Sequence, residues 1–147
     1  MDELDTVDKV ARHAGPPMDV LVAIALGGAL GAPARYGIAQ LAPVTAGSFP
    51  WATFWTNLSG AFVLGVFLTL VIDRLPPTRL LRPFFAVGFL GAYTTFSTVA
   101  VETATLVKDG DAALGVGYTL ASISAGLLVA YLGIALGRAL PGERTSL

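Results

Sequence analysis

The residues best able to do chemistry in this 147-residue chain lie in one stretch, GAYTTFSTVAVE, over residues 91–102. Within an otherwise apolar run it carries four hydroxyl side chains and then a carboxylate: Thr94, Thr95, Ser97, Thr98 and Glu102. Hydroxyl side chains can bond to the carbonyl four residues back and loosen a helix. Irregular backbone at membrane depth is tolerated only where it is buried in protein or lines a cavity, and its freed carbonyls are suited to an alkali cation. Two interpretations stay open here, a broken helix and an intact helix with back-bonded hydroxyls.

A second polar group lies in the apolar segment WATFWTNLSGAFVLG, where Asn57 follows Thr53 by four residues, on the same helical face. An amide at membrane depth is costly unless it finds hydrogen-bond partners. Asn57 is therefore either an interhelical hydrogen-bonding group or a side-chain N–H donor that lines a polar path. Tyr118 and Ser122, also four residues apart, form a further polar track in the last apolar segment.

Arg35 and Glu102 are the strongest candidates for charges inside the membrane. Ionisable residues at such depth usually face a cavity or pair with one another. Each lies six or seven residues from the end of its apolar segment, so each is either an interfacial anchor or a vestibule charge.

Enzymatic chemistry finds little support in the composition. The chain has no cysteine, and its one histidine, His13, lies in a polar tail. Disulfides, thiolate metal sites and cysteine nucleophiles are thereby excluded. Hydrolysis requires a nucleophile beside a base, and the apolar segments contain neither cysteine nor histidine, so we expect a protein that is not an enzyme.

The elements that must position these residues are set by hydropathy. The chain is 54% hydrophobic and 13% charged, about half the charge of a soluble domain. Its mean hydropathy is +0.72. Four apolar segments, at 20–41, 51–72, 84–107 and 114–137, each reach the length of about 20 residues that spans a bilayer. We therefore expect an all-α integral membrane protein with a transmembrane domain over 20–140, a polar tail at 1–19 and a short tail at 141–147.

Orientation follows from counting Lys and Arg beside the spans. Seven lie on the side shared by the termini and the middle loop: Lys9, Arg12, Arg74, Arg79, Arg82, Arg138 and Arg144. The opposite side has Lys108, and also Arg35 if that side chain extends outward. The bias predicts a multi-pass protein of the plasma membrane with both termini in the cytoplasm.

Three motifs together resemble the CrcB/Fluc family of fluoride channels. GGALGAPARYGI at 27–38 is similar to the family's GGxxGAxxRY pattern, WTNLSGAFVLG at 55–65 to TNxxGxFxxG, and GAYTTFSTVAVE at 91–102 to GGxTTFSTF. They fall in order on three successive spans, and the resemblance covers roughly residues 20–137. It implies an antiparallel, dual-topology dimer with two narrow pores and a third helix broken near the dimer axis. It also implies passive export of fluoride, which lowers the cytoplasmic concentration of this ion.

The resemblance assigns roles residue by residue. It implies a structural Na⁺ at the dimer interface, held by the backbone carbonyls of Gly91 and Thr94. It places two groups at the anion path, Asn57 as a donor and Phe96 as a ring that meets an anion through its positive edge. The other pore-lining positions that it implies are Thr53, Thr95, Tyr118 and Ser122, and the vestibule positions are Arg35 and Glu102.

Two departures from the pattern suggest a variant assembly. Val99 stands where the signature has its second phenylalanine, and Gly126 stands where the polar track would continue with a hydroxyl. An antiparallel homodimer also favours a balanced Lys and Arg count, which this chain lacks. We therefore keep the alternative that the chain is one subunit of a two-gene heterodimer whose oppositely oriented partner supplies the missing aromatic ring. A four-helix proton-coupled drug exporter is less favoured, because the first span contains no acid.

Overall fold

The computed structural model describes residues 15–73 and 79–140, and these residues form helices and loops only. In chain order the elements are α2 (Met18–Leu41), α3 (Trp51–Asp73), η1 (Pro83–Leu90), α4 (Gly91–Tyr93), α5 (Phe96–Lys108) and α6 (Ala112–Ala139). Four stretches are long and apolar enough to cross a membrane: Met18–Leu41, Trp51–Val71, Pro83–Lys108 and Ala112–Ala139. The expected all-α architecture of four spanning helices is confirmed.

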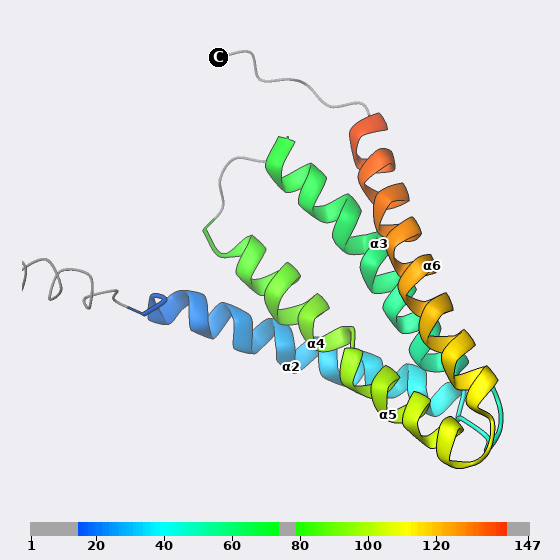
Figure 1. The fold of residues 1–147 in the computed structure, drawn as a ribbon. Helices are drawn as coiled ribbons and strands as arrows, with labels where there is room; N and C mark the ends of the chain where they lie inside the picture. Colours follow the sequence, from blue (N-terminus) through cyan, green and yellow to red (C-terminus); the bar gives the residue numbers. More distant parts are fainter. Residues whose placement is uncertain (1–14, 74–78, 141–147) are drawn as a thin grey trace, which may run out of the picture.

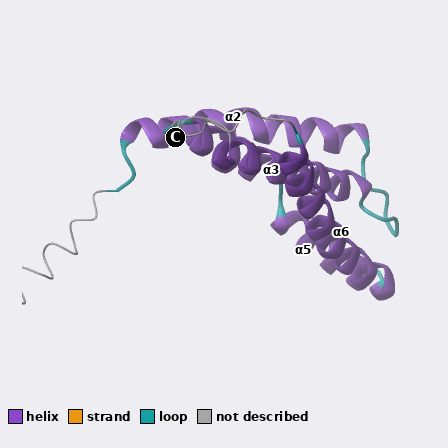
Figure 2. Cartoon of the chain, turned by 90° about the horizontal axis from the view of Figure 1, so that it is seen from above, coloured by secondary structure: helices purple, strands orange, loops and turns teal. Residues whose placement is uncertain are grey.

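The helices form two diverging arms (Figure 1). α3 and α6 lie side by side in one arm, and α2 lies beside η1 and α4 in the other (Figure 2). The arms meet where the loops at 42–50 and 109–111 lie and where α5 packs on the first half of α6. They separate toward the start of α2 and the end of α6 (Figure 1).

The first span begins slightly earlier than the hydropathy indicates. Met18 and Asp19, expected in the polar tail, form the first turn of α2 after Pro17. Asp19 suits this place because a carboxylate is favourable near the positive end of the helix dipole. It also accepts a hydrogen bond from Arg79 at 3.0 Å, which ties the middle loop to the start of α2. Four of the seven counted cations, Lys9, Arg12, Arg74 and Arg144, lie outside the described residues.

Glycine lets the backbones approach within each arm. A Cβ built on Gly27 would overlap the carbonyl oxygen of Phe84, and one on Gly31 would overlap that of Phe89. The same holds in the other arm for Gly65 against Ala130 and for Gly133 against Phe62. Lipid tails give no hydrophobic drive for helix association, so such close backbone packing is what holds the arms together.

The third span is irregular over its first half. η1 is a π-helix that starts with Pro83 in its first turn and ends at Leu90, directly before the polar stretch. π-helical turns are rare and occur frequently at functional sites. The sequence pattern does not predict this widening, because a π turn changes the hydrogen-bond register without changing the apolar character of the segment.

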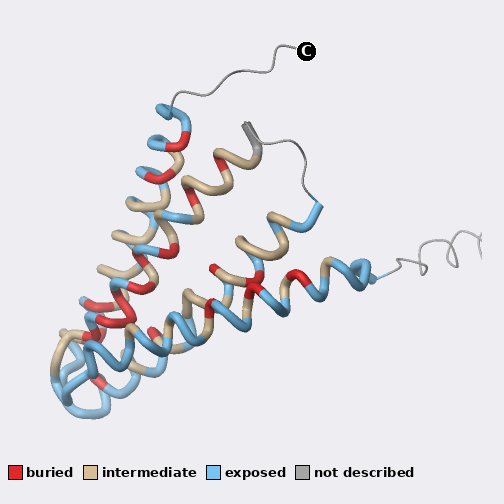
Figure 3. The backbone as a smooth tube through the Cα atoms, turned by 180° about the vertical axis from the view of Figure 1, so that it is seen from behind, coloured by how far each residue is buried: buried red, intermediate tan, exposed pale blue. Residues whose placement is uncertain are grey.

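A small core closes the junction of the arms. Phe54, Leu58, Val99, Leu106 and Tyr118 form its buried part. Phe49 adds edge-on ring contacts to Phe54 at 5.3 Å and to Tyr118 at 5.1 Å between centroids. Elsewhere most side chains on the arms are exposed or half-buried (Figure 3). Such apolar exposure is expected of a chain covered by lipid or by a second subunit.

We expect Gly27→Ala to destabilise the protein by about 1–3 kcal/mol, because the added methyl group forces α2 and η1 apart. Gly37→Ala is the matched control on the same helix, since no atom lies within 4 Å of a Cβ built there. Thermal unfolding in detergent, monitored by size-exclusion chromatography, measures the difference. Equal melting temperatures for the two variants would contradict the assigned contact.

Candidate functional site

The third span breaks at Thr94 and Thr95. Thr94 still ends the helix normally, because its N–H donates to the Leu90 carbonyl at 2.9 Å. Its ψ of 158° and the φ of −152° and ψ of 124° at Thr95 then make the backbone extended. The helix resumes at Phe96 as α5. Of the two interpretations of the hydroxyl cluster, the structure has the broken helix.

Asn57 on α3 binds both backbone groups of Thr95. The Thr95 N–H donates to Asn57 Oδ1 at 2.8 Å, and Asn57 Nδ2 donates to the Thr95 carbonyl at 2.9 Å. These two bonds pair both the N–H and the carbonyl of Thr95, as a neighbouring β-strand would pair those of an extended residue. It uses one of the two Nδ2 hydrogens, so Asn57 keeps a second donor. Sequence reasoning missed Thr95 as the partner because backbone groups leave no trace in a residue pattern.

The hydroxyl cluster starts the new helix. Thr95 Oγ1 accepts a hydrogen bond from the Thr98 N–H at 3.2 Å, which is N-capping of α5. The same oxygen lies 3.0 Å from Thr98 Oγ1 and 3.2 Å from Ser97 Oγ. Thr94 Oγ1 instead donates back to the Leu90 carbonyl at 2.8 Å. The hydroxyls therefore supply the local bonds that replace helical ones at the break.

Two carbonyls lose their regular donors at this point. In a continuous helix the Thr95 N–H would donate to Gly91 and the Thr98 N–H to Thr94. Both N–H groups are diverted, the first to Asn57 and the second to Thr95 Oγ1. The carbonyls of Gly91 and Thr94 are thus among those that the break releases, and they are the two that the family resemblance assigns to a cation. Among the described residues no three His, Cys, Asp or Glu side chains gather to hold a metal.

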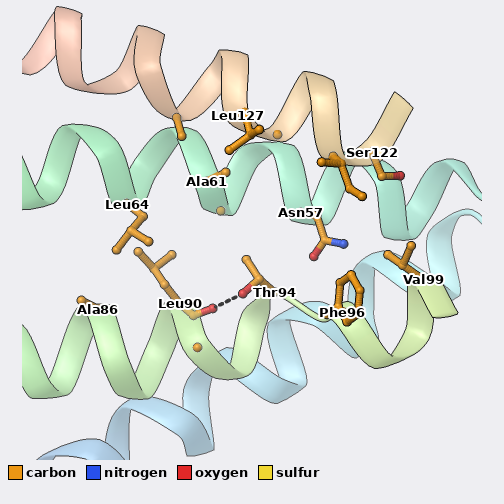
Figure 4. Close-up of a pocket in the computed structure, with 15 residues that line it drawn as sticks. Asn57, Ala61, Leu64, Ala86, Leu90, Thr94, Phe96, Val99, Ser122 and Leu127 are labelled. Carbon is orange, nitrogen blue, oxygen red and sulfur yellow. Dashed lines mark hydrogen bonds between the residues drawn. The ribbon is translucent and has the colours of Figure 1, made fainter. Parts of the chain in front are cut away.

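A groove of about 440 Å³ lies between the two arms, beside the break (Figure 4). α3 and α6 form one wall, and η1, α4 and the start of α5 form the other. The polar side chains that line it are Asn57, Thr94 and Ser122, and the remaining lining is apolar and includes Phe96, Val99 and Gly126. Ser122 Oγ is buried at this wall near the Tyr118 hydroxyl, but it makes no hydrogen bond of standard geometry in the described part of the chain.

Glu102 belongs to a separate cluster at the junction of the arms. Thr53 Oγ1 donates to Glu102 Oε1 at 2.8 Å, and the Tyr118 hydroxyl donates to Oε2 at 2.7 Å. Thr53 is buried and Tyr118 is fully buried. Neither residue lines the groove, and nor does Glu102. The structure thus places Asn57, Phe96 and Ser122 at the groove and Thr53, Tyr118 and Glu102 in the carboxylate cluster. Thr95 and Arg35 belong to neither set.

Phe96, Val99 and Arg35, which also belong to the three sequence motifs, differ strongly in their exposure. Phe96 is 75% exposed, so its ring is available to a neighbouring subunit as well as to the groove. Val99 is 4% exposed and packs in the core while it also lines the groove. Arg35 is half-buried on α2, and no hydrogen bond or ion pair joins it to Glu102 in the described residues.

Comparisons with known proteins give one family. The family described as CrcB-like protein, Camphor Resistance (CrcB), matches residues 22–134. A Streptomyces avermitilis protein named Fluoride-specific ion channel FluC 3 is 47% identical over 128 residues, which cover 87% of this chain and 63% of that relative's length. FluC 2 of the same organism is 45% identical over 77% of this chain and 70% of its own length. FluC 1 of Mycolicibacterium paratuberculosis is 46% identical over 80% of this chain and 89% of its own length.

We expect Tyr118→Phe to destabilise the protein by about 1–3 kcal/mol, because it leaves one oxygen of Glu102 without its buried donor. Tyr131→Phe on the same helix is the control, since Tyr131 is 66% exposed. Melting temperatures in detergent measure both. If the two variants melt alike, the Tyr118 hydroxyl does not stabilise the carboxylate cluster.

Proposed function

The chain belongs to the CrcB-like family, and on that basis we propose that it is a fluoride-selective ion channel and not an enzyme. It lets fluoride leave the cell passively and so lowers the cytoplasmic concentration of this ion. The observation that carries the proposal is the identity of 45–47% to proteins named fluoride-specific ion channels. The membrane-spanning architecture of the four apolar helices agrees with it.

The groove offers donors of the kind that a small, strongly hydrated anion requires. The second Nδ2 hydrogen of Asn57 and the Ser122 hydroxyl lie in its walls. Phe96 adds an aromatic ring, whose edge carries partial positive charge. Several weak donors in series allow an anion to enter and also to leave, as conduction demands. Thr53, Thr95 and Tyr118 would extend the polar lining toward Glu102, with Arg35 and Glu102 near the vestibules.

A structural Na⁺ is the cofactor that fits the break. The carbonyls of Gly91 and Thr94 would hold it, two from each of two subunits, since the break frees both from helical bonding. Hard oxygen donors without competing carboxylates suit a weakly bound alkali cation. When bound, the ion supplies a fixed positive potential that favours anions nearby.

A dimer in the plasma membrane is the assembly that we propose. The exposed ring of Phe96 and the open, apolar groove between the arms provide a surface for a second subunit in the opposite orientation. The lipid bilayer covers the remaining apolar side chains. The Lys and Arg bias places both termini in the cytoplasm. Among the described residues, exposed Arg79, Arg82 and Arg138 lie on the side of the termini, and exposed Lys108 lies on the opposite side.

A heterodimer is the second candidate assembly, and the same charge bias favours it. One strongly biased chain inserts in one orientation, so an antiparallel dimer would need an oppositely oriented paralogue. Streptomyces avermitilis has two numbered relatives, which agrees with paired genes but does not require them.

We expect purified protein in liposomes to release fluoride and to retain chloride. Asn57→Asp, assayed at pH 8, should slow fluoride efflux roughly a thousand-fold, because a unit charge about 4 Å from the ion costs about 4 kcal/mol. Tyr131→Phe should conduct at the normal rate. Normal flux through Asn57→Asp would refute the pore assignment, and equal release of both anions would refute the selectivity.

If this chain is one half of a heterodimer, a reporter fused to the C terminus should give signal from only one side of the membrane when the chain is expressed alone. Fluoride efflux should then require co-expression of an oppositely oriented paralogue. Signals of equal strength from both sides would remove the topological argument. Conducting channels formed by this chain alone would show that pairing with a paralogue is not obligatory.

A further inference from the structure

We infer that Asn57 is the positioning residue that holds the third span open, so that a single amide sets both the cation carbonyls and the anion groove. The inference rests on the proposed function for the identity of the two ions. It is carried by the two hydrogen bonds between Asn57 and Thr95, at 2.8 Å and 2.9 Å, and by what those bonds remove from the helix.

The first step is the competition for the Thr95 N–H. In hydrocarbon this donor has no water to bond, so it goes either to the Gly91 carbonyl, which closes the helix, or to another protein group. Asn57 Oδ1 is the group that takes it. Because Asn57 Nδ2 also satisfies the Thr95 carbonyl, both backbone groups of the extended residue are paired with one side chain.

The second step is the space that brings α3 to the break. Gly60 lies three residues after Asn57 and thus on the same face of α3. A Cβ at this position would overlap Thr94 Cγ2 and approach the Tyr93 ring to 3.2 Å. A side chain at position 60 would therefore push against the Thr94 and Tyr93 side chains beside the break and shift them relative to Asn57.

The third step links the clamp, the pair of bonds between Asn57 and Thr95, to the groove. Nδ2 has two hydrogens, and the bond to Thr95 orients the amide plane that carries the second one. Asn57 lines the groove, so an anion that accepts this second hydrogen shares its donor nitrogen with the clamp. Loss of the clamp therefore has two effects. It disturbs the carbonyls assigned to the cation, and it removes the bond that orients the anion donor.

A competing explanation is that the Thr95 N-cap alone maintains the break. Thr95 Oγ1 already accepts from the Thr98 N–H and would do so without Asn57. That bond explains how α5 begins, but it does not occupy the Thr95 N–H, which remains free to close on Gly91. The two explanations differ in what happens to cation binding when Asn57 is changed.

The experiment measures how Na⁺ raises the melting temperature of the full-length protein in detergent, with N-methyl-D-glucamine as the replacement cation. A ligand that binds only the folded state raises its stability with concentration. Wild type and Tyr131→Phe, a variant at an exposed residue of α6 that does not line the groove, should show the same half-maximal Na⁺ concentration. Asn57→Ala should raise it at least tenfold, and Gly60→Ala should do the same while it leaves the amide in place.

Asn57→Asp gives a rescue that depends on protonation. A neutral carboxyl has one O–H donor and one carbonyl acceptor, so it can make both bonds to Thr95, whereas an ionised carboxylate only accepts. The Na⁺ response of this variant should be weak at pH 8 and recover once the pH falls below the pKa of the introduced carboxyl, with wild type unchanged over the same range. Simple attraction between a carboxylate and Na⁺ predicts the reverse order.

The outcomes separate this inference from the proposed function. A wild-type Na⁺ response in Asn57→Ala, or a response of Asn57→Asp that does not depend on pH, overturns the inference. If Asn57→Ala does not fold, the pH comparison on Asn57→Asp decides alone. If the melting temperature of the wild type does not change with Na⁺ while its fluoride flux is normal, the inference is overturned and the channel function is supported. The expected Na⁺ pattern in a protein without fluoride flux supports the inference and refutes the function.

Discussion

The absence of water from the bilayer core is the constraint on which this structure depends. Every backbone N–H and carbonyl there must find a partner in the protein, which ordinarily means an unbroken helix. This chain interrupts a spanning helix at Thr94 and Thr95 and supplies substitutes one by one. Asn57 takes both backbone groups of Thr95, and the Thr95 hydroxyl takes the Thr98 N–H. The carbonyls of Gly91 and Thr94 are therefore left without their helical donors beside a break that is otherwise hydrogen-bonded.

The same constraint shapes the two arms. Within each arm glycine brings backbones into direct contact, at Gly27 and Gly31 in one and at Gly65 and Gly133 in the other. Between the arms the chain leaves an open, largely apolar groove and an exposed Phe96 ring. Tight arms and an open middle suit a molecule whose functional surface is completed by something outside the single chain.

Much of this could be predicted from the sequence, because the deciding patterns are local. Hydropathy and length give the four spans, whereas the hydroxyl pattern leaves the third span open to two interpretations and only the family resemblance implies its break. Three of the residues expected at the anion path, Asn57, Phe96 and Ser122, line one groove in the structure. Partners across helices could not be predicted. Glu102 accepts from Thr53 and Tyr118, and Asn57 binds backbone, because those contacts depend on how helices rotate and approach. The roles of these residues in conduction stay predictions.

Val99 lies where the core and the groove share a wall. Its side chain packs against Phe54, Leu58 and Tyr118 on one side and faces the groove on the other, so the partition there is one residue thick. A substitution that improves packing at this position necessarily reshapes the passage, and one that widens the passage opens a cavity in the core. Evolution cannot tune permeation and folding separately at such a site. Variation at position 99 among relatives should therefore be accompanied by compensating changes in the aromatic neighbours behind it.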